Sequence, residues 1–441
     1  MSMSSPLNVA PISTLPCYEY VTRVVFDNGL RVLVRENHAA PVTVIDGYLP
    51  TGSIHDPQDK AGLASFVANM LSRGSRQYDF DTFNTLIEGV GASMAAGADE
   101  HNTSFGATSL SEDFPTMLQI LADILRHPTF PPAHINRLRN QKLVHIQERD
   151  EDTQEVAALR FYEMLYPNHP YGRSTAGYTH TISTIERADL EAFHATHYSP
   201  QDAILVVVGD VETNATLDLI HQYLGDWQEP SSAQTLPPSP SLTPVPLLNE
   251  VRQQHSAIPG KIQSDIFLGC PAVPRHHPDY FPIRIANTIL GRFGMMGRLG
   301  DNVREQQGLA YYVYSSQEAG PNAGLWYAAA GVNPANVEQA IASMQSEFAR
   351  LATEPVDAEE LADTQAYLTG VLPLQLETND GVASTLLNIE WNRLGLDYLH
   401  RYNDLIYTVT VEDVQRVAQT YLRPDAYVLS VAGPAAVEPT N

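Results

Sequence analysis

The pattern of hydrophobic and polar residues predicts both strands and helices in each half of the chain. Phe26–Arg35 is typical of a turn followed by an alternating strand, and Pro41–Pro50 is a second β-branched stretch. Longer segments have hydrophobic residues three or four positions apart, as in helices that cover a core. These segments are Ala61–Arg73, Asp81–Gly89, Phe114–Arg126, Pro132–Asp150, Tyr280–Leu290, Pro334–Ala352, Ala358–Leu372 and Gly381–Leu394. Because strands and helices come in clusters, we expect the α+β class, with helices packed on mostly antiparallel sheets.

The second half of the chain repeats a pattern of the first half. The segment Asp189–Gly209 corresponds to Asp413–Gly433, which lies 224 positions later. Each segment begins as an acidic helix start, continues as an amphipathic helix with a proline stop, and ends in a buried strand and a glycine. The proline-rich stretch 229–250 between them is typical of an extended linker. The sequence therefore predicts two homologous domains, 1–228 and 251–441.

Composition restricts the classes of function. The 441 residues include 43% hydrophobic residues, which is enough for sizeable cores and excludes global disorder. The formal net charge is −25, from 26 Lys and Arg against 51 Asp and Glu. A protein with this negative charge repels phosphate backbones and anionic lipid surfaces. We therefore expect neither a nucleic-acid partner nor a membrane partner.

Cysteine content and the first residues suggest a compartment. Cys17 and Cys270 are the two cysteines, and they form neither a disulfide framework nor a metal-binding spacing. The segment Met1–Pro16 has no basic and apolar regions typical of a signal peptide. The longest aliphatic run, Ala203–Val208, is far too short to span a bilayer. We expect a cytoplasmic protein. The alternative is a protein whose leader was removed before this sequence begins.

One predicted helix has the frame of a metallopeptidase motif. The stretch Gly62–Leu71 resembles the helix of the pitrilysin/insulinase-type zinc metallopeptidase family, whose members carry the inverted motif H-x-x-E-H. In that family the two histidines hold zinc and the glutamate acts as general base. The corresponding residues here are Ser65, Ala68 and Asn69. The helix therefore keeps its apolar packing residues and lacks the chemistry of the motif.

The resemblance also locates a third zinc-ligand position. In the family this ligand is a glutamate on a downstream helix, and counting back from Tyr166–Arg173 places it on His145. A shift of one position would give Val144 or Ile146, and none of the three is glutamate. A zinc site needs several convergent ligands, so we expect no metal on this chain and an ordinary helix position for His145.

A substrate-binding edge strand is a further feature implied by the resemblance. It corresponds to the segment around Ala95, Ala96 and Gly97, where the family usually has an asparagine at the position of Ala95. Such a strand receives an extended peptide by β-augmentation. Because glycine and alanine are weak strand formers, a flexible loop is the alternative interpretation.

The second half retains the other part of the family's site. The segment Arg298–Ser315 resembles the C-terminal domain signature, in which an arginine and a tyrosine seven residues apart complete the active site. The matching residues are Arg304 and Tyr311. A tyrosine hydroxyl can stabilise the oxyanion of peptide hydrolysis, and an arginine can bind substrate carbonyls. The alternative is a surface arginine and an ordinary strand aromatic.

The resemblance implies half of a clamshell and a function that depends on a partner. We expect the non-zinc subunit of a two-subunit metalloendopeptidase, a heterodimer whose partner carries H-x-x-E-H and the zinc and whose substrate is a peptide. A first alternative is an inactive homologue that acts as a peptide-binding or scaffold homodimer. A second alternative is an independent zinc peptidase that uses other ligands.

Overall fold

The chain forms two β-sheets, one on each side of the proline-rich stretch. The computed structural model describes residues 19–228, 242, 245–292 and 297–435, so Cys17 and most of the predicted linker 229–250 lie outside the described residues. The first sheet has the strand order β1-β2-β6-β3-β5-β4, and the second has the order β7-β11-β8-β10-β9. The strands are β1 (Thr22–Val25), β2 (Arg31–Glu36), β3 (Val42–Leu49), β4 (Ser93–Ala98), β5 (Thr103–Leu110), β6 (Ile204–Gly209), β7 (Arg252–Ala257), β8 (Ser264–Ala272), β9 (Ala310–Ala319), β10 (Gly324–Val332) and β11 (Val428–Gly433).

The two sheets share one topology. In the first sheet β2 and β6 are parallel, and in the second sheet β7 and β11 are parallel. All other neighbouring strands of both sheets are antiparallel. The strands β6 and β11 end at the two glycines that the sequence repeat aligns. The prediction of two homologous α+β domains is therefore confirmed.

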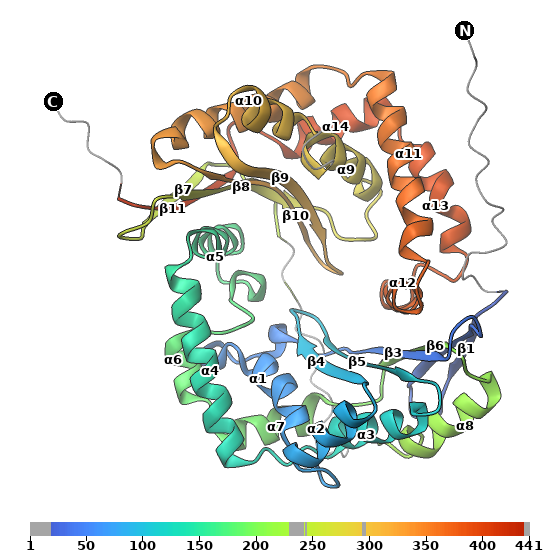
Figure 1. Ribbon diagram of the computed structural model, residues 1–441. Coiled ribbons are helices and arrows are strands. Elements are labelled where there is room, and N and C mark those ends of the chain that lie inside the picture. Colours follow the sequence, from blue (N-terminus) through green and yellow to red (C-terminus); the bar gives the residue numbers. More distant parts are fainter. Residues whose placement is uncertain (1–18, 229–241, 243–244, 293–296, 436–441) are drawn as a thin grey trace.

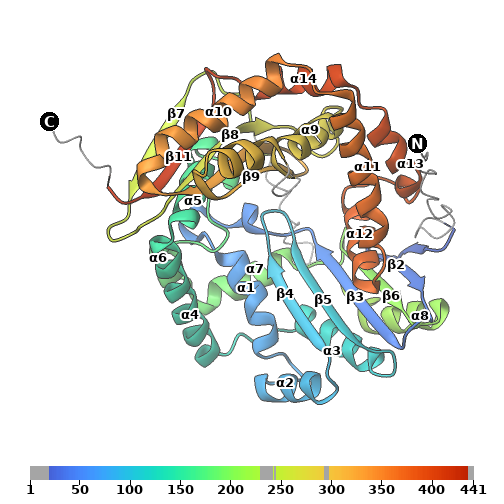
Figure 2. The same ribbon diagram turned by 45° about the horizontal axis from the view of Figure 1, so that its top comes forward.

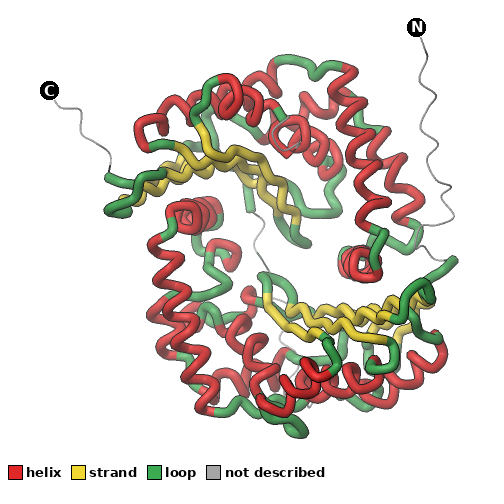
Figure 3. The backbone as a smooth tube through the Cα atoms, in the orientation of Figure 1, coloured by secondary structure: helices red, strands yellow, loops and turns green. Residues whose placement is uncertain are grey.

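Helices pack on both sheets, most of them on the outer faces. They are α1 (Leu63–Met70), α2 (Phe80–Gly89), α3 (Phe114–Arg126), α4 (Pro132–Glu151), α5 (Thr153–Leu165), α6 (Thr179–Thr184), α7 (Arg187–His197), α8 (Thr213–Leu224), α9 (Tyr280–Asn287), α10 (Val337–Thr353), α11 (Ala358–Gln375), α12 (Asn379–Trp391), α13 (Tyr398–Tyr407) and α14 (Val411–Tyr421). Figure 3 shows the strands of both sheets towards the middle of the molecule and most helices outside them. Within the described segments, no helix combines the length and the apolar character that crossing a membrane requires.

Two helices are exchanged between the halves. Helix α5 belongs to the first half but packs on β8 and β11 of the second sheet, where Phe161 contacts the ring of Phe267. Helix α12 belongs to the second half but packs on β3 and β6 of the first sheet, where Leu386 and Val206 share one hydrophobic cluster. Figure 1 shows α5 and α12 at opposite sides of the space between the sheets. Because each half completes the other's core, the domain limits at 228 and 251 stay a prediction.

Ion pairs reinforce one of these exchanged helices. The Glu390 carboxylate on α12 accepts hydrogen bonds from Arg23 on β1 at 2.8 Å and from Arg31 on β2 at 3.0 Å. The side chains of Arg31 and Glu390 are only 11% and 10% exposed. A charged pair that is this well buried is costly to break, because the remaining charge has lost both water and its partner. The contact fixes α12 to the edge of the first sheet.

Candidate functional site

Helix α1 is held at its N-terminus by a buried carboxylate. Gly62, the residue before the helix, has φ +95°, and a Cβ there would lie 2.7 Å from Ile182 Cδ1 and 2.9 Å from the Ala176 carbonyl oxygen. The Asp56 carboxylate accepts the backbone N–H groups of Gly62 and Ala64, each at 2.8 Å. Burial raises the pKa of Asp56 to about 7. The glycine and the aspartate together fix the entry of the chain into α1.

A lysine from α4 contacts the first position of the degenerate motif. The Lys142 Nζ donates a hydrogen bond to the Ser65 hydroxyl at 2.8 Å and lies 5.8 Å from the centre of the Phe66 ring. Burial lowers the pKa of Lys142 to about 8, and the nearby Asp56 carboxylate opposes this shift. The motif's first position thus faces an ammonium group.

These residues do not fit a zinc ion. A cation already binds the Ser65 oxygen, the buried Ala68 presents only a methyl group, and Asn69 is half-buried with an amide side chain. His145 lies exposed on α4, and Lys142 is the α4 side chain that reaches Ser65. Across the described parts of the chain, no group of three His, Cys, Asp or Glu gathers that could hold a metal ion. The chain keeps the helix pair of a metallopeptidase without its ligands.

Sequence reasoning did not single out Lys142. Lys142 and His145 are three residues apart, so they share one face of α4. That spacing was the available signal, since any residue one turn away from a ligand position can point to the same site. The fold then decides which of the two side chains contacts α1.

The segment proposed for substrate binding forms an edge strand. Residues Ala95–Gly97 lie in β4, which pairs with β5 on one side and ends the first sheet on the other. Of the two sequence interpretations, strand and flexible loop, the structure has the strand. Helix α1 packs beside β4, and Figure 2 shows β4 at the end of the row β3, β5, β4. An edge strand presents backbone groups that an extended peptide can pair with.

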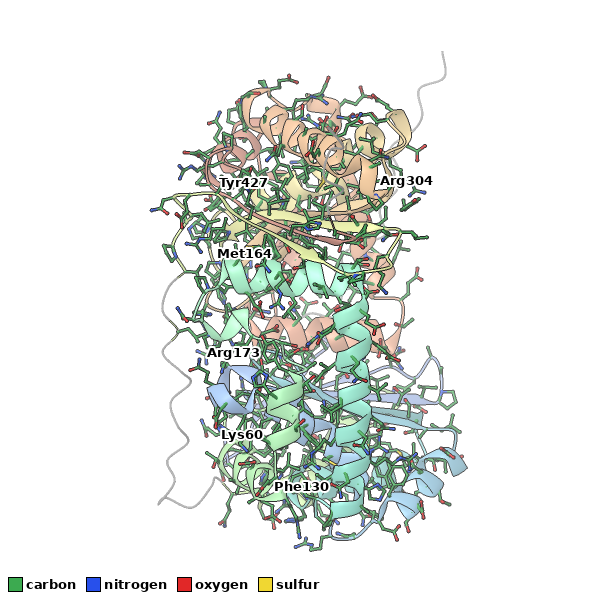
Figure 4. The ribbon with its side chains drawn as sticks, turned by 90° about the vertical axis from the view of Figure 1, so that its left-hand side faces the viewer. Lys60, Phe130, Met164, Arg173, Arg304 and Tyr427 are labelled. Carbon is green, nitrogen blue, oxygen red and sulfur yellow. The ribbon has the colours of Figure 1, made fainter. Side chains whose placement is uncertain are left out.

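Arg304 and Tyr311 lie in the other half of the molecule. Arg304 lies in the last turn of a short π-helical segment, Gly300–Gln306, and Tyr311 is the second residue of β9. The turn between them contains Gly308 at φ +61°, and its backbone N–H donates to the Arg304 carbonyl at 3.0 Å. The side chain of Arg304 is 41% exposed, and Tyr311 is 59% exposed. Figure 4 shows Arg304 at the outer edge of its half. The exposure of both side chains leaves them accessible to another molecule.

Comparison with known proteins identifies the family. Residues 31–179 match the model of the insulinase family, peptidase family M16, and residues 184–368 match that of the peptidase M16 inactive domain. These two matches include helix α1 and every strand of both sheets except β1 and β11. The chain belongs to this pitrilysin/insulinase-type peptidase family.

Individual relatives agree along nearly the whole chain. The mitochondrial-processing peptidase subunit beta of Mus musculus is 27% identical over 421 residues, which cover 92% of this chain and 83% of the relative. An uncharacterized zinc protease of Mycobacterium leprae is 24% identical, covering 95% and 93%. Among solved structures, a peptidase M16 inactive domain from Pseudomonas fluorescens is 25% identical with a TM-score of 0.86, covering 96% of this chain and 100% of that one. A protease from Helicobacter pylori, 19% identical with a TM-score of 0.88 and coverage of 95% and 100%, shares the fold.

Proposed function

We propose that this chain is the non-zinc subunit of a two-subunit zinc metallopeptidase, with a homologous H-x-x-E-H subunit as its partner. The hydrogen bond between Lys142 and Ser65 carries the proposal, because it sets a cation where the family motif has a metal ligand. A relative that is named a peptidase subunit and another that is named a zinc protease support a role in peptide hydrolysis. Zinc would be supplied by the partner, and this chain alone would hydrolyse no peptide.

The residues that this chain would contribute are donors. Tyr311 would stabilise the oxyanion at the partner's zinc site, and Arg304 would bind backbone carbonyls of the peptide. Their exposure supports this role, since a group that acts across an interface must be accessible in the free subunit. The edge strand around Ala95, Ala96 and Gly97 would pair with the extended peptide.

A second candidate is a peptide-binding or scaffold homodimer without catalysis. The edge position of β4 favours it, because a peptide can add to this strand whether or not zinc is present. The two candidates differ in their partner and in their dependence on zinc.

Co-expression with an H-x-x-E-H homologue from the same organism tests the proposal. We expect the two chains to co-purify, with stoichiometric zinc and peptidase activity in the complex and neither in the isolated chain. If the chain forms a homodimer and does not bind the co-expressed homologue, the result favours the scaffold candidate. Stoichiometric zinc in the isolated chain would overturn both candidates.

A further inference from the structure

A polar cavity of about 510 Å³ lies in the second half, and its lining includes neither Arg304 nor Tyr311. Its walls come from α9, the end of β9, α11, α12 and α13. This volume is within the usual range of small-molecule sites, about 300–1,000 Å³. The lining is rich in amide and hydroxyl groups, from Gln317, Gln375, Asn388, Asn392, Ser384 and Thr385.

Two arginines line this cavity without acidic partners. Arg275 is only 8% exposed, lies 3.9 Å from the centre of the Tyr280 ring, and donates to the Tyr398 hydroxyl at 2.8 Å. Arg284 donates to the Tyr280 hydroxyl at 3.2 Å. In the described part of the chain, no aspartate or glutamate lines the cavity or forms an ion pair with either arginine. In a chain with 51 acidic residues against 26 basic ones, two such arginines are unusual.

The tyrosines of the cavity reinforce its preference for a negative charge. Burial raises the pKa of Tyr398 and of Tyr402, so both hydroxyls stay protonated over the physiological range. Tyr398 accepts its hydrogen bond from Arg275, so its own proton is free for an acceptor in the cavity. The Tyr402 hydroxyl instead donates to the Leu368 carbonyl at 3.4 Å. The cavity therefore combines two guanidinium groups and the Tyr398 phenol as donors, with aromatic rings on which an apolar group can pack.

A buried cation without a counterion is unfavourable, because it has lost water and gained no charged partner. An anion in the cavity would supply that partner and would form charge-assisted hydrogen bonds, which are about twice as strong as neutral ones. We propose that this cavity binds a carboxylate group of a peptide, held by Arg275 and Arg284. The surrounding side-chain amides would pair with the peptide backbone, which favours a peptide over a bare inorganic anion.

The carboxylate has two sources, the C-terminus of a peptide and an acidic side chain, and both offer the planar acceptor that an arginine fork matches. The site does not depend on the proposed function, since binding is measured on the free chain without any zinc-bearing partner. Its failure would leave the subunit proposal intact, and the reverse also holds.

The test uses isothermal titration calorimetry with the full chain. The probes are acetyl-Ala-Leu-Tyr with a free carboxylate, the same peptide amidated, acetyl-Ala-Glu-Tyr amide, and inorganic phosphate. We expect at least tenfold tighter binding for one or both carboxylate-bearing peptides than for the amidated peptide without glutamate. The preferred peptide identifies the source of the carboxylate. Equal binding of all three peptides, no binding, or a preference for phosphate overturns the proposal.

Variants then assign the binding to the two arginines. Arg275→Gln and Arg284→Gln should each weaken binding of the preferred peptide at least tenfold, whereas the exposed Arg401→Gln should not. Should Arg275→Gln fail to fold, hydrogen exchange on the unmodified chain replaces it. The preferred peptide should then slow exchange in α12 (Asn379–Trp391) more than the amidated peptide without glutamate does. Unchanged affinity in folded variants, or unchanged exchange in α12, overturns the proposal.

Discussion

The Lys142 ammonium lies 2.8 Å from the Ser65 hydroxyl, so helix α4 presents a positive charge to the first position of the degenerate motif on α1. The motif position on α1 does not only lack a metal ligand. The Lys142 ammonium also puts a positive charge beside this position, which repels a divalent cation at short range. Side chains of both α1 and α4 therefore make this position unsuitable for a zinc ion.

Restoring the motif should not restore zinc binding while Lys142 remains. The variant with Ser65→His, Ala68→Glu, Asn69→His and His145→Glu should bind zinc at least tenfold more weakly than the same variant with Lys142→Ala added, because the ammonium repels the metal. Competition with a chromogenic chelator measures both affinities.

Lys60→Ala serves as the matched control for that experiment. Lys60 lies near the start of α1 but forms an ion pair with Asp189 at 2.8 Å. The Lys60→Ala substitution should leave the zinc affinity of the restored motif unchanged. Tight zinc binding with Lys142 in place would contradict the repulsion argument.

Stability should depend on pH through Lys142. Burial lowers its pKa to about 8, whereas lysine in an unfolded chain titrates near pH 10.4. Between these values the unfolded chain binds more protons, so the free energy of unfolding rises with pH. The parent should gain roughly 3 kcal/mol relative to Lys142→Met between pH 8 and 10.4. Urea unfolding across this range measures the difference, and parallel profiles would show that Lys142 titrates normally.

Loss of the two exposed donors should reduce activity of the assembled peptidase. Tyr311→Phe removes the hydroxyl and should lower kcat by about 10²-fold, the usual effect of losing one oxyanion donor. Arg304→Ala should raise KM, because it removes a contact to the substrate backbone. Steady-state assays of the complex separate the two effects. Tyr407→Phe, at another exposed tyrosine, is the control, and full activity in both site variants would refute the assigned roles.

Glu390→Ala should destabilise the whole chain. The substitution leaves the buried Arg31 with only the longer ion pair to Asp202 at 3.9 Å among the described residues, and should lower the free energy of unfolding by about 3 kcal/mol. Chemical denaturation measures this loss. Glu354→Ala is the control, since the Glu354 side chain is 60% exposed and its ion pair with Arg350 lies at the surface. Equal stability of the two variants would mean that the contact between α12 and the first sheet contributes little.

Local pattern predicted much of the fold. The helical period of Pro132–Asp150 is found in α4, which ends at Glu151, and the aligned repeat gave both β6 and β11. The helical period of the hydrophobic residues could not show that α5 and α12 each pack on the sheet of the other half. An apolar helix face has the same spacing whichever sheet covers it.

The candidate sites were predicted unevenly for the same reason. Ser65, Ala68 and Asn69 were recognised because they fill a motif of fixed spacing on one helix. Lys142 was missed because its contact joins two helices. Arg275 and Arg284 line one cavity through the packing of α9, α11, α12 and α13, which no local spacing records.

The exchange of helices also has a consequence for synthesis on the ribosome. The last strand of the first sheet ends at Gly209, and the helix that covers its inner face ends at Trp391, 182 positions later. At about 5–20 residues per second, translation of this stretch takes roughly 10–40 s. Until then the buried face formed by Ile204, Val206 and Val208 stays open to other chains. We therefore expect the nascent N-terminal half to be a chaperone client, and soluble yield to fall when translation of the second half is slowed.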